Sequence, residues 1–140
     1  MVQSETDRQQ VIEAVTKYAW GYDQKDFGLL GEAMAINATS GGKITGTDVT
    51  WGPMKSRDEV VSGLQAMRNG QTMQPRHCLG NFLFSRQSDS SASLRCYLTL
   101  LASEGGRAGV ATTGYFDIDA VKEGNVWRIS RLDVTLDAPF

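Results

Sequence analysis

The chain has 140 residues, the length of a single domain, and its 41% hydrophobic and 21% charged residues are typical of a globular protein rather than a disordered one. Its net charge of −2 argues against general binding to nucleic acid or to anionic membranes, because both require an excess of basic residues. Residues 1–10 are too polar for a signal peptide, and no run approaches the ~20 apolar residues of a transmembrane helix.

The sequence also contains few of the residues that form metal sites and disulfides. Cys78 and Cys96 lack the spacing of a CxxC motif and are too few for a disulfide framework. One histidine and two cysteines are likewise too few for the usual zinc clusters. We therefore expect one cytoplasmic domain over residues 1–140, with no metal and no cofactor.

Two helices are predicted in the first third of the chain. Between Asp7 and Tyr22, apolar and aromatic residues recur at the spacing of one helix face, which predicts an amphipathic helix. This stripe consists of Val11, Val15, Tyr18 and Tyr22, with Ile12 and Ala19 beside it. Asp26 is a suitable N-cap for a second, shorter helix that extends to Met34. The polar, glycine-rich stretch Asn37–Gly46 then predicts a loop.

A short strand, a third helix and four long strands are predicted after this loop. Trp51 lies in a short strand that ends at Gly52-Pro53. Ser56 and Glu59 form a capping box for a helix that ends near Arg68. Strand-like alternation marks four further segments, Arg76–Ser85, Ser91–Ser103, Arg107–Val121 and Asn125–Leu136. Helices followed by an antiparallel meander indicate an α+β domain, in which long strands can curl around the helices and enclose a pocket.

His77 is the only histidine, so any imidazole chemistry depends on this residue. Strand alternation places His77, Leu79 and Asn81 on one face of the sheet. Cys78 falls on the opposite face, which argues against a Cys–His nucleophile pair. A histidine that is hydrogen-bonded in the core, or one exposed at the surface, is the structural alternative.

Two residues of the first helix are candidate partners for His77. Asp23 lies near the helix C-terminus, where the helix dipole disfavours a carboxylate, so a buried partner such as His77 explains its presence. The alternative for Asp23 is a solvated position in the turn. Tyr18 lies on the apolar stripe, where its hydroxyl requires a partner, although packing alone also accounts for a tyrosine there.

Other side chains are candidates for the wall of a pocket. Trp51 and Phe116 can line an apolar pocket, or they can belong to the ordinary core. Arg131 lies on the last predicted strand, where it can orient an anionic substrate or form a salt bridge on a solvated sheet face.

Four short segments of the chain occur in an order and spacing that resembles a known family. They are Tyr18–Phe27, Gly52 with the helix that begins at Ser56, Arg76–Asn81, and Gly114–Asp117 with the segment from Gly124 to Ile129. Over about Asp7–Leu136 the sequence resembles the SnoaL-like branch of the nuclear-transport-factor-2-like superfamily. The resemblance implies a cone-shaped α+β barrel, in which N-terminal helices pack in a strongly curved, mostly antiparallel sheet that encloses one pocket.

The resemblance also implies roles for individual residues. Scytalone dehydratase, bile-acid 7α-dehydratase and hexachlorocyclohexane dehydrochlorinase belong to this branch and use a histidine–aspartate pair, and His77 and Asp23 stand at the matching positions. Tyr18 matches a tyrosine of the bile-acid enzyme, and Arg131 lies beside the position of an arginine in the dehydrochlorinase. The candidates for substrate binding are Trp51, Leu79, Asn81, Tyr115, Phe116 and Arg131.

We predict a cofactor-independent, dehydratase-type lyase that acts on a small, largely apolar or cyclic substrate, with a histidine–aspartate pair as general base. An isomerase or cyclase with the same base is one alternative. A non-catalytic ligand-binding protein or structural subunit is the other, because one fold supports many functions. By the same resemblance we expect a homodimer or a homotrimer, with no nucleic-acid or membrane partner.

Overall fold

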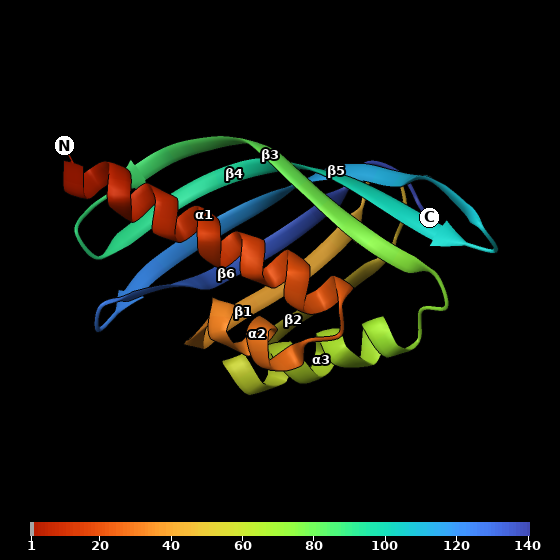
Figure 1. Ribbon diagram of the computed structural model, residues 1–140, viewed down its shortest axis with the longest axis horizontal. Helices are drawn as coiled ribbons and strands as arrows, with labels where there is room; N and C mark the ends of the chain where they lie inside the picture. Colours follow the sequence, from red (N-terminus) through yellow and green to blue (C-terminus); the bar gives the residue numbers. More distant parts are fainter. Residues whose placement is uncertain (1) are drawn as a thin grey trace.

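The computed structural model describes residues 2–140, with side chains from Ser4 onward, and contains three helices and six strands (Figure 1). In chain order these are α1 (Val2–Asp23), α2 (Phe27–Ala33), β1 (Met34–Ile44), β2 (Thr50–Lys55), α3 (Arg57–Asn69), β3 (Gln74–Gln87), β4 (Ser91–Glu104), β5 (Arg107–Glu123) and β6 (Val126–Leu136). Across residues 2–140, no helix is long and apolar enough to cross a membrane.

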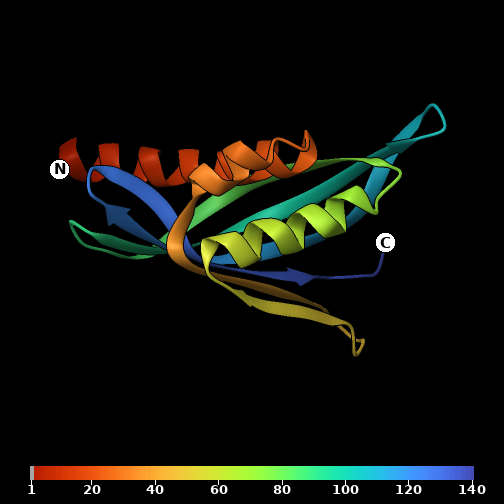
Figure 2. The same cartoon turned by 90° about the horizontal axis from the view of Figure 1, so that it is seen from below.

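The six strands form one sheet in the order β2-β1-β6-β5-β4-β3. Neighbouring strands are antiparallel except for β1 and β6, which run parallel. The sheet is curved but does not close, and all three helices lie on its concave side (Figure 2). The predicted α+β class, with helices packed in a strongly curved and mostly antiparallel sheet, is therefore confirmed.

The hydrophobic core lies between the helices and the concave face of the sheet. The predicted stripe of the first helix is buried, since Val11, Val15, Tyr18 and Tyr22 are all at most 6% exposed. Along β4, buried residues alternate with more exposed ones from Ser91 to Leu100, as a sheet with one covered face requires. Apolar burial on this face, at ~25 cal/mol per Å2, is the main stabilising contribution to the fold.

Helix junctions follow the local signals in the sequence. The side chain of Asp26 accepts a hydrogen bond from the Leu29 N–H at 3.1 Å and caps α2. The hydroxyl of Ser56 accepts the N–H of Glu59 at 3.2 Å, which confirms the predicted cap of α3. At the α1–α2 junction a Cβ on Gly21 would lie 2.6 Å from the nitrogen of Leu30, so the close approach of the two helices requires glycine there.

The prediction of a loop over Asn37–Gly46 is wrong, because most of this stretch belongs to β1. Its glycines permit a close contact rather than a turn, since a Cβ on Gly42 would overlap the indole ring of Trp51. The hydroxyl of Ser40 is buried and donates to the carbonyl of Leu132 at 2.8 Å. The predicted end of the next strand is wrong as well, since β2 continues through Gly52-Pro53 to Lys55, on an edge of the sheet.

A bulge in β3 overturns part of the predicted alternation. Asn81 has a φ of +55°, and the register with β4 shifts between Gly80 and Leu83. Asparagine tolerates this left-handed conformation better than most residues, and a bulge reverses which side chains face the core. Asn81 is consequently exposed, and Phe82 is the residue that turns toward the core beyond the bulge.

Candidate active site

The side chains of Asp23 and His77 form a buried pair. Asp23 is the last residue of α1, and His77 lies on the edge strand β3. The Oδ1 of Asp23 lies 2.6 Å from the Nδ1 of His77, and the two side chains are only 6% and 12% exposed, respectively. The predicted proximity of the carboxylate and the imidazole is therefore present in the fold.

The same carboxylate also binds the backbone of the strand. Oδ2 of Asp23 accepts the main-chain N–H of His77 at 2.8 Å. Because Oδ1 acts as acceptor for the ring, Nδ1 of the neutral imidazole carries the proton and Nε2 retains its lone pair. Two contacts to one residue thus fix both the tautomer and the direction of the imidazole.

Further donors hold the end of α1 in place. The carbonyl oxygen of Asp23 accepts hydrogen bonds from Nη2 of Arg68 at 3.1 Å, Nε of Arg68 at 3.4 Å and Nε2 of Gln74 at 2.9 Å. Carbonyl groups in the last turn of a helix have no partner within the helix, so side chains must satisfy them when the end is buried. Arg68 itself is 4% exposed.

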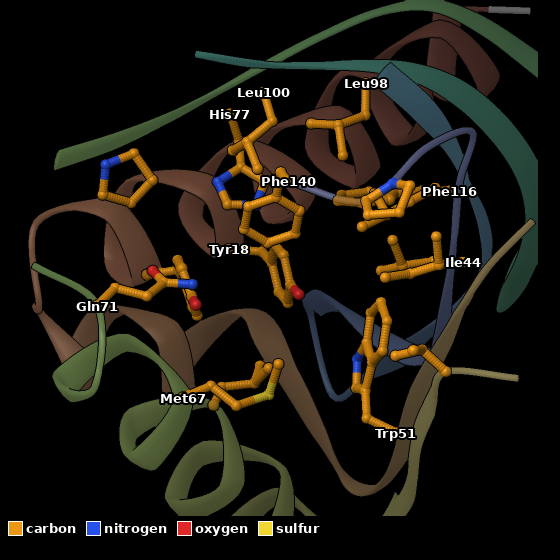
Figure 3. Close-up of a pocket in the computed structure, with 17 residues that line it drawn as sticks. Tyr18, Ile44, Trp51, Met67, Gln71, His77, Leu98, Leu100, Phe116 and Phe140 are labelled. Atoms are coloured by element: carbon orange, nitrogen blue, oxygen red, sulfur yellow. The ribbon is translucent and has the colours of Figure 1, made fainter. Parts of the chain in front are cut away.

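Beside this pair lies a cavity of about 330 Å3 enclosed by α1, α3, the sheet and the last residues of the chain (Figure 3). Most of the lining is aliphatic or aromatic: Ile44, Val49, Trp51, Leu64, Met67, Pro75, Leu98, Leu100, Phe116, Val134, Leu136, Pro139 and Phe140. The polar lining side chains are Tyr18, Tyr22, Gln71 and His77. This combination of apolar walls with few polar groups is characteristic of small-molecule sites.

The two tyrosines of α1 face His77 from adjacent turns of the helix. The ring of Tyr22 lies edge-on to the imidazole with 5.3 Å between centroids, and that of Tyr18 with 6.4 Å. Burial raises the pKa of Tyr18 above its usual range. Burial also raises the pKa of Tyr22 to about 12, although a hydrogen bond from Gln71 and the charge of Arg68 lower it in part. Both hydroxyls are therefore protonated at neutral pH and can donate a hydrogen bond.

Not every predicted substrate-binding residue reaches this cavity. Trp51 and Phe116 line it as expected. Leu79 packs against the core without lining the cavity. Asn81 and Tyr115 instead line a hollow outside the cavity, because the bulge and the strand alternation direct them away from it.

Arg131 also points away from the cavity. Its guanidinium forms salt bridges with Asp119 at 2.9 Å and Asp133 at 2.8 Å. These carboxylates raise the pKa of Arg131 and occupy its donors. The neighbouring residue Leu132 is the one that faces the core, as alternation along a strand requires. The expected role of Arg131 in orienting an anion is therefore not supported by its position.

Four polar residues near the site were not assigned to it from the sequence: Tyr22, Arg68, Gln71 and Gln74. Tyr22 lies four residues after Tyr18 and was assigned to packing, although the same spacing gives it the same environment. Arg68 lies four residues after Leu64, which itself follows Val60 by four. An arginine on the apolar stripe of α3 is the signal that identifies a buried charge.

The two cysteines differ in burial, and neither lines the cavity. Cys78 is exposed, and Cys96 is buried with its pKa raised to about 12 by burial. Cys78 therefore lies on the face of β3 opposite His77, as the strand alternation predicts. Among residues 2–140, no group of three histidine, cysteine or acidic side chains is arranged to hold a metal ion.

Three helices packed in the concave face of an open, curved sheet, beside an apolar cavity, are characteristic of small α+β proteins with the cystatin-like fold. The family model for the SnoaL-like domain matches residues 3–133. The chain therefore belongs to the SnoaL-like family. A search of curated proteins gives no match.

Several solved structures have the same cystatin-like fold. A protein of unknown function from Nostoc punctiforme is similar with a TM-score of 0.81 and 19% identity, over 94% of this chain and 92% of that chain. The β subunit of a candidate aromatic-ring-hydroxylating dioxygenase from Novosphingobium aromaticivorans gives 0.77 and 11%, over 95% and 90%. A candidate scytalone dehydratase from the same organism gives 0.73 and 14%, over 97% and 88%. At these identities the likeness is one of fold alone.

Proposed function

We propose that the protein is a cofactor-independent lyase that eliminates water from a small, neutral and largely apolar molecule. One observation carries this proposal, namely the 2.6 Å contact between Asp23 and Nδ1 of a histidine whose ring lines an apolar cavity. A neutral imidazole held in this way is a suitable general base for a proton on carbon. The family likeness to proteins that include dehydratases supports the same choice.

In the proposed reaction, Nε2 of His77 takes a proton from the carbon next to an electron-withdrawing group. The electrons of the C–H bond form the new double bond, and the C–O bond of the departing hydroxyl breaks. Asp23 stabilises the imidazolium, and the hydroxyl of Tyr18 donates a hydrogen bond to the developing negative charge. His77 then returns its proton to the departing hydroxyl, so that water leaves and the site is regenerated.

The composition of the cavity lining supports a neutral substrate. None of the lining side chains within residues 2–140 belongs to lysine, arginine, aspartate or glutamate. A carboxylate or phosphate bound in such an apolar cavity would lose its hydration without gaining a cationic partner. The aliphatic and aromatic walls instead favour a ring or a short hydrocarbon frame that carries one or two oxygens.

An isomerase with the same base is the second candidate. Tyr18 and Tyr22 both present protonated hydroxyls near the imidazole, and two donors are well suited to hold an enolate oxygen. In that case His77 returns the proton to a different carbon and no group leaves. The likeness to the β subunit of a dioxygenase keeps a non-catalytic subunit as a third candidate.

One experiment distinguishes the three. The protein is incubated in D2O with neutral cyclic β-hydroxyketones, one-ring and two-ring, and the products are followed by NMR. A lyase gives the enone. An isomerase gives deuterium exchange without loss of oxygen, because its base removes and returns a proton but no group leaves. A binding protein gives neither product. For the lyase, His77→Gln should lower the rate by about 100-fold or more, because the general base is lost.

Cys78→Ala is the matched control for this experiment. Cys78 adjoins His77 but its side chain is exposed on the opposite face of the strand. The control should retain full activity. Full activity in both His77→Gln and Asp23→Asn would show that the pair is not the catalytic base.

A further inference from the structure

Arg68 is a buried cation that has no carboxylate partner among the side chains described, those of residues 4–140. It lies on the last turn of α3 and is 4% exposed. Among residues 2–140 it forms no salt bridge, and its hydrogen bonds go to the main-chain oxygen of Asp23. A buried guanidinium is costly unless nearby negative charge compensates for it, so its surroundings must supply that charge.

Negative charge is concentrated where Arg68 reaches α1. The last turn of α1 contains no basic residue, and its free carbonyls form the negative end of the helix dipole. The carboxylate of Asp23 adds a full negative charge to the same residue whose carbonyl Arg68 contacts. Arg68 and Asp23 thus balance each other although their charged groups form no direct salt bridge.

The groups that contact the imidazole itself carry no positive charge, and the neighbouring Arg76 is exposed to solvent, where its guanidinium donates a hydrogen bond to Oε1 of Gln24. Tyr18, Tyr22 and Asp23 face the imidazole from α1, and Phe116 faces it from β5. Both tyrosines are neutral at neutral pH, because burial raises their pKa values. The charge of Arg68 is felt inside the cavity, since it lowers the pKa of Tyr22 relative to burial alone.

We propose that Arg68 is a positioning residue for the Asp23–His77 pair, because it fixes the end of α1 and balances the carboxylate so that the imidazole stays neutral. Without this cation, a buried carboxylate would draw a proton onto His77, and an imidazolium cannot act as a base. The inference rests on the proposed function only in taking His77 to act as a general base. The electrostatic relationship between Arg68 and His77 is measurable without a substrate.

His77 provides the readout because it is the only histidine in the chain. Its two ring nitrogens are followed by 15N NMR across a pH series in four proteins: wild type, Arg68→Gln, Arg68→Lys and Arg57→Gln. Arg68→Gln keeps a donor for the carbonyl of Asp23 but removes the charge, whereas Arg68→Lys keeps the charge. Arg57 is the matched control, since it lies on the first turn of α3 and donates to the carbonyl of Met34 at 2.9 Å.

We expect Arg68→Gln to raise the proton affinity of His77 roughly tenfold, the usual effect of one lost charge near a buried group. Arg68→Lys should stay within about threefold of the wild type, and Arg57→Gln should not change the titration. If Arg68 serves the fold alone, Arg68→Gln lowers the melting temperature but leaves the His77 titration unchanged, and the proposal is overturned. Arg68→Lys provides a second comparison should the glutamine variant not fold, since a tenfold change with the charge retained also contradicts the proposal.

Failure of this inference is distinguishable from failure of the proposed function. A wild-type His77 whose Nδ1 carries no proton at neutral pH would contradict the Asp23–His77 base itself. An unchanged titration in Arg68→Gln, with the proton on Nδ1 in wild type, would contradict the role of Arg68 alone.

Discussion

Asp23 accepts both the ring Nδ1–H and the main-chain N–H of His77, so one carboxylate joins the end of α1 to the free edge of the sheet. An edge strand presents backbone donors that no neighbouring strand satisfies. Here one of these donors is used to orient an imidazole. The same residue therefore contributes both to the fold and to the candidate active site.

The two contacts of Asp23 can be separated by substitution. Asp23→Ala removes both acceptors and should lower the free energy of unfolding by about 1.5–3 kcal/mol, the usual range for hydrogen bonds to a charged group. Asp23→Asn retains one oxygen for the main-chain N–H and should cost less, while losing about 100-fold or more in rate. Urea denaturation of both variants measures the difference, and equal stability of the two would contradict the contact to the strand.

Gly21→Ala should destabilise the protein by roughly 1–3 kcal/mol, because a Cβ there would lie 2.6 Å from the nitrogen of Leu30. Gly28→Ala is the control, since the nearest atom to its Cβ would be 3.7 Å away. Alanine should be neutral or stabilising at that helical position. Thermal denaturation of both variants tests the close packing of α1 on α2, and similar melting temperatures would argue against it.

Stability should fall in alkaline solution as Tyr22 titrates. Its pKa is raised from 10.0 to about 12 in the fold, so the folded state binds the phenolic proton more tightly than the unfolded chain does. The stabilisation is complete below pH 10 and is lost as the pH rises toward 12. Tyr22→Phe should make the free energy of unfolding less steep between these values, as measured by urea denaturation at several pH values. An identical slope in wild type and variant would be the contrary result.

The protein should form a homodimer or a homotrimer through the outer face of the sheet. Leu83 and Tyr97 on this face are 69% and 63% exposed, and large exposed apolar side chains often mark an interface. Tyr97→Glu should shift the mass measured by light scattering toward the monomer. Trp20→Glu is the control, because Trp20 is 58% exposed on α1 instead. A monomeric wild type would rule out this expectation.

Much of the fold follows from local signals in the sequence. The stripe of the first helix, the caps formed by Asp26 and Ser56 and the alternation of the long strands all depend on interactions within a few residues. The loop assigned to Asn37–Gly46 failed because its glycines serve a contact with Trp51, which is a property of the folded molecule. Glycine in a single sequence does not reveal which of these two reasons applies.

The candidate site, like the fold, was predicted only in part. His77 was identifiable as the only histidine and Asp23 as a carboxylate at a helix C-terminus, and both match the positions of the pair in the family that the sequence resembles. Asn81 was assigned to the wrong face because a bulge of one residue reverses the alternation and leaves no clear mark in the sequence. The partnership of Arg68 with the carbonyl of Asp23 spans 45 positions and depends entirely on tertiary packing.

The candidate base and part of the cavity lining lie on different kinds of segment. The candidate base and its partners belong to α1, α3 and β3, whereas Val49, Pro139 and Phe140 contribute to the lining from a hairpin loop and from the end of the chain. Segments of this kind tolerate substitution far better than packed elements. A lineage could therefore exchange one substrate for another by altering these peripheral residues, without disturbing the machinery beneath them.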